Sequence, residues 1–177
     1  MNNKKLLFLN LAVDDKDVSL GFANTWIEQF SLKFEKIDII TLNKSTDSVG
    51  KNNNVNIYGL VKSDKSSKLG KLLKIRKIIK DLTSTNKYDL CFSHMSPLLL
   101  LITKIFCTNT IPSVLWYTHP KPKELSKRTV LILALLFSNK VVTASKSSFP
   151  YNSGKVNVIG HAIDYELFLN KREKVIN

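Results

Sequence analysis

The chain has 177 residues, of which 44% are hydrophobic and 23% charged, so it can bury the core of one ordinary domain. Lys and Arg outnumber Asp and Glu by 27 to 14, and the net charge is +13. This composition excludes a disordered chain. The longest apolar runs, Pro97 to Ile102 and Thr129 to Phe137, are too short to cross a bilayer. The basic, apolar start has no small-residue cleavage site, so we expect a first strand and a cytoplasmic protein.

The first half of the chain predicts two helices and three strands. A continuous apolar run at 5–13 is typical of a strand buried on both faces of a parallel sheet. A helix follows at 22–34, where apolar residues recur at helical spacing and Ser19 can cap the start. Strands are predicted at 37–42 and at 55–60, the second near a sheet edge. Ser66 or Ser67 caps a helix that runs to about Thr83.

The second half continues the alternation with a strand at 88–93 and a helix that Ser96 and Pro97 open and that reaches Phe106. A strand at 113–117, a helix at 125–137 and strands at 140–144 and 155–159 complete the chain. Strands that alternate with helices form βαβ units, so we predict a Rossmann-like, doubly wound α/β fold with a mainly parallel sheet and helices on both faces. Cys91 and Cys107 lack a metal or redox spacing and are expected to be buried free thiols.

Polar residues stand just after several predicted strands, where ligands bind in a sheet of this kind. His94, His119 and His161 each follow a predicted strand, Ser145 follows another, and Gly21 ends the loop after the first strand. A single histidine in such a place is more often a hydrogen-bonded loop residue than a ligand-binding one. Three of them together shift the interpretation towards a shared cleft.

Three common chemistries lack support in the sequence. The histidines are far apart and have no Cys or carboxylate partners at ligand spacing, so no metal is expected. There is no GxSxG motif, and Ser93, Ser96 and Ser145 can equally serve as helix caps. The first loop has only Gly21, so the GxGxxG motif is absent and no dinucleotide cofactor is expected.

Four phrases of the sequence carry a family resemblance: residues 88–94, which end in His94; residues 112–119, Pro-Ser-Val-Leu-Trp-Tyr-Thr-His; residues 139–145; and residues 155–168. They resemble the amino-terminal, acceptor-side domain of GT-B glycosyltransferases, most closely glycosyltransferase family 4. The last phrase is the most specific, because the family often has Gly-Ile-Asp followed by Phe there, although Ala162 replaces the Gly. The resemblance implies a domain over residues 1–168 and an interdomain crossing at 169–177.

The resemblance implies retaining transfer of a sugar from a nucleotide-sugar to a glycan or lipid-linked acceptor held mainly by this domain. His119 would be the catalytic side chain, hydrogen-bonded to a sugar hydroxyl or to the departing phosphate. The acceptor and donor cleft would be lined by Ser19, Gly21, His94, Ser145 and His161. The family usually has a Gly pair in the first loop, and here only Gly21 matches it. The nucleotide-sugar is a co-substrate, and neither a metal nor another cofactor is implied.

The length of the chain departs from the family. The family's second domain, which binds the nucleotide-sugar, would follow Asn177. We therefore expect a truncated gene, an isolated domain or one half of a two-chain enzyme. The expected partner is a carboxyl-terminal nucleotide-sugar-binding domain or subunit, and the 177-residue chain alone is expected to be inactive.

The basic charge is concentrated around one predicted helix. Residues 62–87 hold nine basic residues and two acids, so they contribute seven of the thirteen excess charges. A helical wheel places Leu72, Ile75, Ile79 and Leu82 on a stripe towards the sheet. The flank carries a mixture of apolar and basic side chains: Leu69, Leu73, Arg76, Lys77 and Lys80.

This mixed flank is typical of a peripheral contact with an anionic membrane at its inner face, and a solvated face of a lysine-rich protein is the alternative. A nucleic-acid-binding module competes with the transferase interpretation because of the charge. However, it lacks Arg-rich recognition and an aromatic platform, and Trp26, Phe30 and Phe34 are expected in the core. A nucleic-acid partner is therefore not expected, whereas a non-catalytic binding partner remains open.

Overall fold

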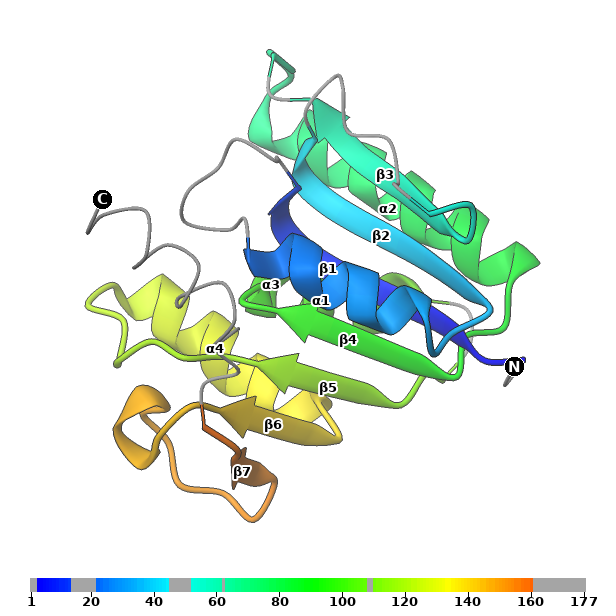
Figure 1. Cartoon of the computed structure of the whole chain (residues 1–177). Coiled ribbons are helices and arrows are strands. Elements are labelled where there is room, and N and C mark those ends of the chain that lie inside the picture. The colour runs from blue at the N-terminus through cyan, green and yellow to red at the C-terminus, as the bar shows by residue number, and fades with distance from the viewer. Residues whose placement is uncertain (1–2, 14–21, 45–51, 62, 108–109, 161–177) are drawn as a thin grey trace, which may run out of the picture.

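The computed structural model describes residues 3–13, 22–44, 52–61, 63–107 and 110–160, and all predicted strands and helices are present in it (Figure 1). The strands are β1 (Lys5–Val13), β2 (Lys36–Lys44), β3 (Val55–Val61), β4 (Leu90–His94), β5 (Ser113–Trp116), β6 (Lys140–Thr143) and β7 (Val156–Val158). The helices are α1 (Phe22–Ser31), α2 (Lys68–Thr85), α3 (Pro97–Phe106), α4 (Leu125–Phe137) and the short 3-10 helix η1 (Lys146–Ser148), which the sequence did not predict.

The strands form one sheet in the order β3-β2-β1-β4-β5-β6-β7, and every pairing is parallel. This confirms the Rossmann-like α/β fold and the edge position predicted for β3. Helices α2, α3 and α4 cover one face and α1 covers the other (Figure 1). The chain leaves β1 in one direction to β2 and later continues in the other direction from β4. The carboxyl ends of β1 and β4 therefore form the switch point at which sheets of this kind bind ligands.

The apolar run of β1 is explained by burial on both faces. Leu7 and Leu9 pack into the core beneath α2, α3 and α4, whereas Leu6 and Phe8 pack into a second core on the α1 side. Cys91 is buried as expected, and Cys107 is only half-buried; both are free thiols. Within the described ranges, no helix is both long and apolar enough to cross a membrane.

Helix α1 ends at Ser31, three residues before the predicted end. The side-chain amide of Asn54, from the segment before β3, donates to the carbonyl oxygens of Ser31 and Phe34, each at 2.9 Å. These bonds satisfy carbonyls that a longer helix would have used. A partner 20 or more residues away thus sets the helix end, which explains why local periodicity placed it too late.

Helix α2 corrects one detail of the predicted stripe. Ile75, Ile79 and Leu82 are buried against the sheet as expected, but Leu72 is 37% exposed. The buried residues of α2 begin only at Ile75, so its first turns lie outside the core. Ser67 caps the start by accepting a hydrogen bond from the Gly70 amide at 3.2 Å.

A polar cluster closes the amino-terminal end of the sheet, opposite the switch point. Its centre is Asp38, which is fully buried. The hydroxyl of Tyr88 donates to Asp38 at 2.6 Å, the Asn56 amide donates at 2.9 Å, and the Lys36 ammonium lies at 3.2 Å. Burial, together with the neighbouring Asp38 carboxylate, raises the pKa of Tyr88, which keeps this hydroxyl a donor. Tyr88, Asn56 and Lys36 all contact the Asp38 carboxylate, so we assign the cluster a structural role.

One glycine is required by a close backbone approach, and this gives a stability prediction. A Cβ atom on Gly59 would lie 2.1 Å from the Thr41 carbonyl oxygen of β2, and Gly59 has φ +153°. Gly59→Ala must therefore push β3 from β2, and we expect a loss of about 2–3 kcal/mol in the free energy of unfolding, measured by urea titration. Gly154→Ala is the control, because nothing lies within 4 Å of its Cβ position. An equal loss in both variants would contradict this account.

Candidate functional site

A buried pair of polar side chains marks the switch point. Asn10 near the end of β1 and His94 at the end of β4 are direct partners in the parallel register, and both are fully buried. The Nδ1 atom of His94 lies 3.0 Å from Oδ1 of Asn10. The Leu11 amide also donates to this Oδ1 atom at 3.0 Å, which identifies Oδ1 as an acceptor. His94 Nδ1 therefore carries the hydrogen, and Nε2 holds the lone pair.

The surroundings of His94 are aromatic and keep its ring neutral. Trp26 of α1 packs edge-on against the imidazole with ring centres 5.3 Å apart, and Phe8 of β1 lies at 6.4 Å. Burial lowers the pKa of His94 from 6.5 to about 4. At neutral pH the ring can accept a hydrogen bond at Nε2 but carries no charge.

The turn after His94 has an unusual backbone. Met95 has φ 52°, the left-handed conformation, which is uncommon for a residue other than glycine. Its amide donates to the Trp116 carbonyl at 2.9 Å, and the Thr118 amide lies 3.4 Å from its sulfur atom. Ser93 adds a bond from its hydroxyl to the Ser96 carbonyl at 2.9 Å. These contacts tie the β4 turn to the end of β5 and hold the edge of the site in one shape.

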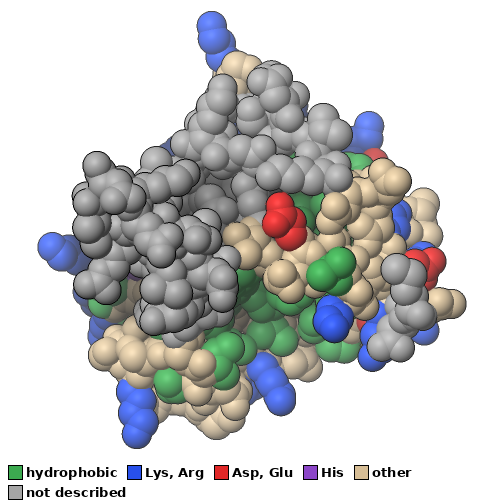
Figure 2. Space-filling view, in the orientation of Figure 1, with side chains coloured by type: hydrophobic (Ala, Val, Ile, Leu, Met, Phe, Trp, Pro, Cys, Tyr) green, Lys and Arg blue, Asp and Glu red, His purple; other side chains and the backbone are tan. Residues whose placement is uncertain are grey.

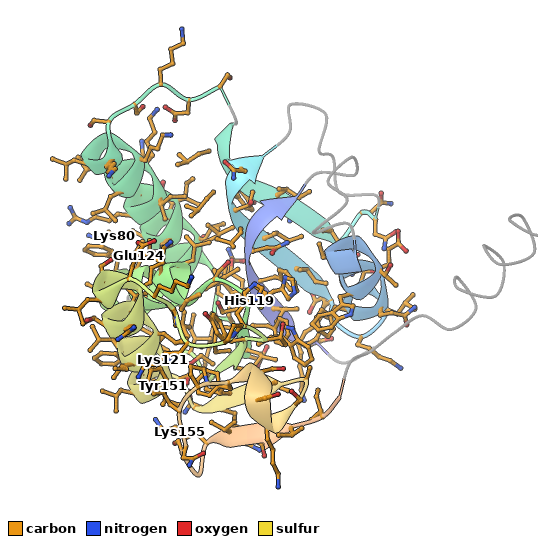
Figure 3. All side chains as sticks on the ribbon, turned by 90° about the vertical axis from the view of Figure 1, so that its left-hand side faces the viewer. Lys80, His119, Lys121, Glu124, Tyr151 and Lys155 are labelled. Atoms are coloured by element: carbon orange, nitrogen blue, oxygen red, sulfur yellow. The ribbon has the colours of Figure 1, made fainter. Side chains whose placement is uncertain are left out.

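His119 lies three residues beyond β5 and is exposed, in contrast to His94. Figure 3 looks onto the carboxyl ends of the strands and shows His119 near the centre of this edge, between α1 on one side and α2 and α4 on the other. Its ring packs edge-on against Tyr117 at 5.9 Å. Tyr117 in turn contacts Phe149 at the same distance. His119 is thus an exposed side chain that packs on the aromatic pair Tyr117 and Phe149.

Ser145 is half-buried after β6, at the same edge of the sheet. Its hydroxyl lies 3.0 Å from that of Ser147 and 2.6 Å from that of Ser148. It also precedes η1, but its hydroxyl makes no capping hydrogen bond with a backbone amide of that helix, so its contacts do not support the alternative role of a helix cap. Of the other predicted cleft residues, Ser19, Gly21 and His161 lie outside the described residues.

An apolar cavity of about 400 Å³ lies on the α1 side of the sheet. Figure 2 shows hydrophobic side chains at the surface on this side, below α1. Trp26 connects the cavity to the switch point, because its ring contacts Trp116 at 4.9 Å as well as His94. The lining residues come from α1, the sheet and the end of β7: Trp26, Gln29, Phe30, Phe92, Trp116, Val142, Ile159 and Gly160.

The sequence did not reveal this cavity, because the helical spacing of Trp26 and Phe30 predicts only core positions for them. They do pack on the core, but they also form the cavity wall. The order of the elements could have indicated the cavity. When α3 and α4 cover the face opposite α1, no helix in the described part of the chain covers β5 and β6 on the α1 side.

The described residues contain no group of three or more His, Cys, Asp or Glu side chains that could hold a metal ion.

Comparisons with known proteins point to one architecture. Neither a protein-family profile nor a curated protein matches the sequence. Among solved structures, sucrose-phosphate synthase from Thermosynechococcus elongatus is similar with a TM-score of 0.67 and 10% identity, over 98% of this chain and 53% of that protein. HepE from Anabaena, solved with UDP, gives 0.58 and 16% over 97% and 50%. A glycosyltransferase from Rickettsia africae gives 0.57 and 15% over 99% and 50%.

The chain therefore spans about half the length of these solved proteins. At such identities the likeness establishes the fold and nothing finer. The fold is one Rossmann-like half of the GT-B glycosyltransferase architecture, as the sequence resemblance implied.

The buried His94 predicts a pH dependence of stability. Its pKa is lower in the folded chain than in the unfolded chain, so stability is complete above pH 6.5 and falls as the pH decreases towards 4. Between pH 7.5 and pH 5 we expect wild type to lose about 2 kcal/mol more in the free energy of unfolding than His94→Gln, measured by urea titration. His119→Gln, at the exposed histidine, should keep the wild-type dependence. Equal slopes for wild type and His94→Gln would disprove the assignment.

Proposed function

We propose that this chain is the acceptor-binding domain of a retaining glycosyltransferase that transfers a sugar from a nucleotide-sugar to a glycan or lipid-linked acceptor. The observation that carries the proposal is the match of almost the whole chain to about half of several solved glycosyltransferases. Kinship with glycosyltransferase family 4, which the phrases around His119 and at 155–168 suggest, is part of the same proposal.

The arrangement of the edge supports a division of roles. Asn10 and His94 form a buried, uncharged, hydrogen-bonded pair beneath the proposed ligand position at the switch point. The left-handed turn at Met95 fixes the backbone at the border of this position. His119 is exposed and supported by Tyr117, so it can reach a ligand without rearrangement of the core. In the proposed reaction the oxygen of an acceptor hydroxyl forms a bond to the anomeric carbon, and the bond from that carbon to the nucleotide diphosphate breaks. The hydroxyl proton passes to the leaving diphosphate, and the sugar keeps its configuration. His119 hydrogen-bonds a sugar hydroxyl or the leaving phosphate.

The cavity beside this edge supports an acceptor with apolar surface. Trp26 and Trp116 provide aromatic walls, and the side chain of Gln29 is the polar one among the lining residues. Aromatic faces suit both the apolar faces of sugar rings and hydrocarbon chains. A glycan and a lipid-linked sugar both fit this description. The proposed partner is a nucleotide-sugar-binding domain or subunit, and the basic flank of α2 (Leu69, Leu73, Arg76, Lys77 and Lys80) is the proposed contact with an anionic membrane.

The proposed division of labour predicts that the 177-residue chain alone does not turn over a nucleotide-sugar. The assay incubates purified chain with a panel of radiolabelled nucleotide-sugars and glycan acceptors, and follows both hydrolysis and transfer. We expect no product above the buffer control. Measurable turnover that co-purifies with the chain would show that the nucleotide-sugar site is already present, and would overturn this part of the proposal.

The role of His119 is testable by acceptor binding. Saturation-transfer NMR with a panel of glycans identifies a binding glycan, and calorimetry then gives its affinity. We expect His119→Ala to weaken binding about tenfold, the effect of losing one hydrogen bond to a ligand. Lys123→Ala, another exposed position in the same loop, is the control and should bind as wild type does. Unchanged affinity in His119→Ala, or equal losses in both variants, would remove His119 from the site.

A further inference from the structure

The outer surface of the helix layer exposes many large apolar side chains. On α4, Leu136 is 62% exposed and Phe137 is 55% exposed, although the opposite side of the helix is buried on the sheet. On the neighbouring α3, Ile105 is 68% exposed. On α2, Leu69 and Leu73 are exposed as the helical wheel predicted. Apolar exposure therefore extends over three adjacent helices and is not confined to the flank of α2.

The same three helices carry almost all of the helical charge. Together they hold nine Lys or Arg residues and one acid, Asp81. Helix α1 on the opposite face holds one acid, Glu28, and no basic residue. The basic excess of these helices therefore lies on one side of the sheet. We call the outer side of α2, α3 and α4 the basic–apolar face.

Cations and apolar groups are interleaved on this face. The guanidinium of Arg76 on α2 lies 5.1 Å above the ring of Phe106 at the end of α3, so the charge sits on an aromatic side chain. Lys77 and Lys80 are exposed on the same helix. Long basic side chains can lie along an apolar surface while their charged ends reach outward. An anionic lipid bilayer offers both an apolar interior and a negatively charged surface to such a face.

The position of the face relative to the site is informative. Helices in βαβ units run antiparallel to the strands, so the first turns of α2, α3 and α4 lie at the carboxyl edge of the sheet. Leu69, Leu98 and Leu125 stand in these first turns, and all are exposed. Figure 3 shows the starts of α2 and α4 flanking the edge that contains His119. The basic–apolar face therefore continues to the rim of the candidate site.

We infer that the basic–apolar face docks the domain onto an anionic lipid bilayer and that the acceptor is held in that bilayer, with its polar head reaching the edge near His119. The choice of a lipid-linked acceptor rests on the proposed function, and the docking extends the membrane contact proposed there for the flank of α2 to the outer side of all three helices. The excess of basic residues favours a bilayer over a protein as the partner. A protein partner would need a large acidic surface with apolar pockets that match the separate exposed Leu, Ile and Phe side chains of this face.

The test is co-sedimentation of the 177-residue chain with vesicles of 70% phosphatidylcholine and 30% phosphatidylglycerol at 50 mM NaCl. We expect binding at least tenfold stronger than to phosphatidylcholine alone, and strongly reduced at 500 mM NaCl. The variant Arg76→Gln/Lys77→Gln/Lys80→Gln should bind about 10- to 100-fold more weakly. Its control, Lys4→Gln/Lys33→Gln/Lys140→Gln, removes the same charge from exposed positions outside the helix layer and should keep most of the binding.

A second pair of variants, one test and one control, examines the contribution of the apolar side chains to vesicle binding. Leu136 on α4 and Leu32 after α1 are 62% and 67% exposed, so neither substitution disturbs the core. Leu136→Ser should weaken vesicle binding several-fold, whereas Leu32→Ser should not. No binding to anionic vesicles, or equal losses in the test and control variants, would overturn the docking. Self-association through this face, seen by light scattering without vesicle binding, would also overturn it. Glycan binding that depends on His119 would survive either result and leave the proposed acceptor-binding role standing without its membrane contact.

Discussion

The handedness of connections in a parallel sheet governs the organisation of this domain. Crossovers of one hand place helices on opposite faces according to the direction in which the chain moves along the sheet. The step from β1 to β2 puts α1 on one face, whereas the steps through β4, β5 and β6 put α2, α3 and α4 on the other. One constraint thus produces the switch point, the open apolar face beside α1 and the continuous outer surface of three helices.

The candidate site combines rigid and accessible parts. The Asn10–His94 pair joins the two strands that diverge at the switch point, and Trp26 packs against both His94 and the cavity wall. Any ligand at this edge would meet a floor that does not need to reorganise. The polar cluster around Asp38 stabilises the opposite end of the sheet, so the candidate site and this structural support lie at opposite ends of the strands. The basic–apolar face lies beside the first of these ends, which joins the proposed membrane contact to the proposed transfer site.

The predicted order and type of elements are confirmed because they depend on local periodicity and on burial of strands from both faces. The predictions are wrong where contacts with distant parts of the chain set a helix end or the burial of a side chain. Asn54 ends α1 at Ser31, and the first turns of α2 lie outside the core, so Leu72 is exposed. For the site, the sequence placed His94 and His119 just after strands; His119 does lie three residues beyond β5, whereas His94 is the last residue of β4. It could not distinguish them, although one is buried and neutral and the other is exposed.

The sequence by itself determined the doubly wound fold and the concentration of charge near α2, and it predicted the carboxyl edge of the sheet as the place for a site. These features follow from residue spacing and composition, which do not depend on distant contacts. Only the tertiary structure decided which aromatic residues border a cavity, which histidine is desolvated, and that α3 and α4 extend the apolar surface begun by Leu69 and Leu73. Burial and side-chain contact are properties of surfaces brought together from distant parts of the chain, so they exist only once the sheet has assembled.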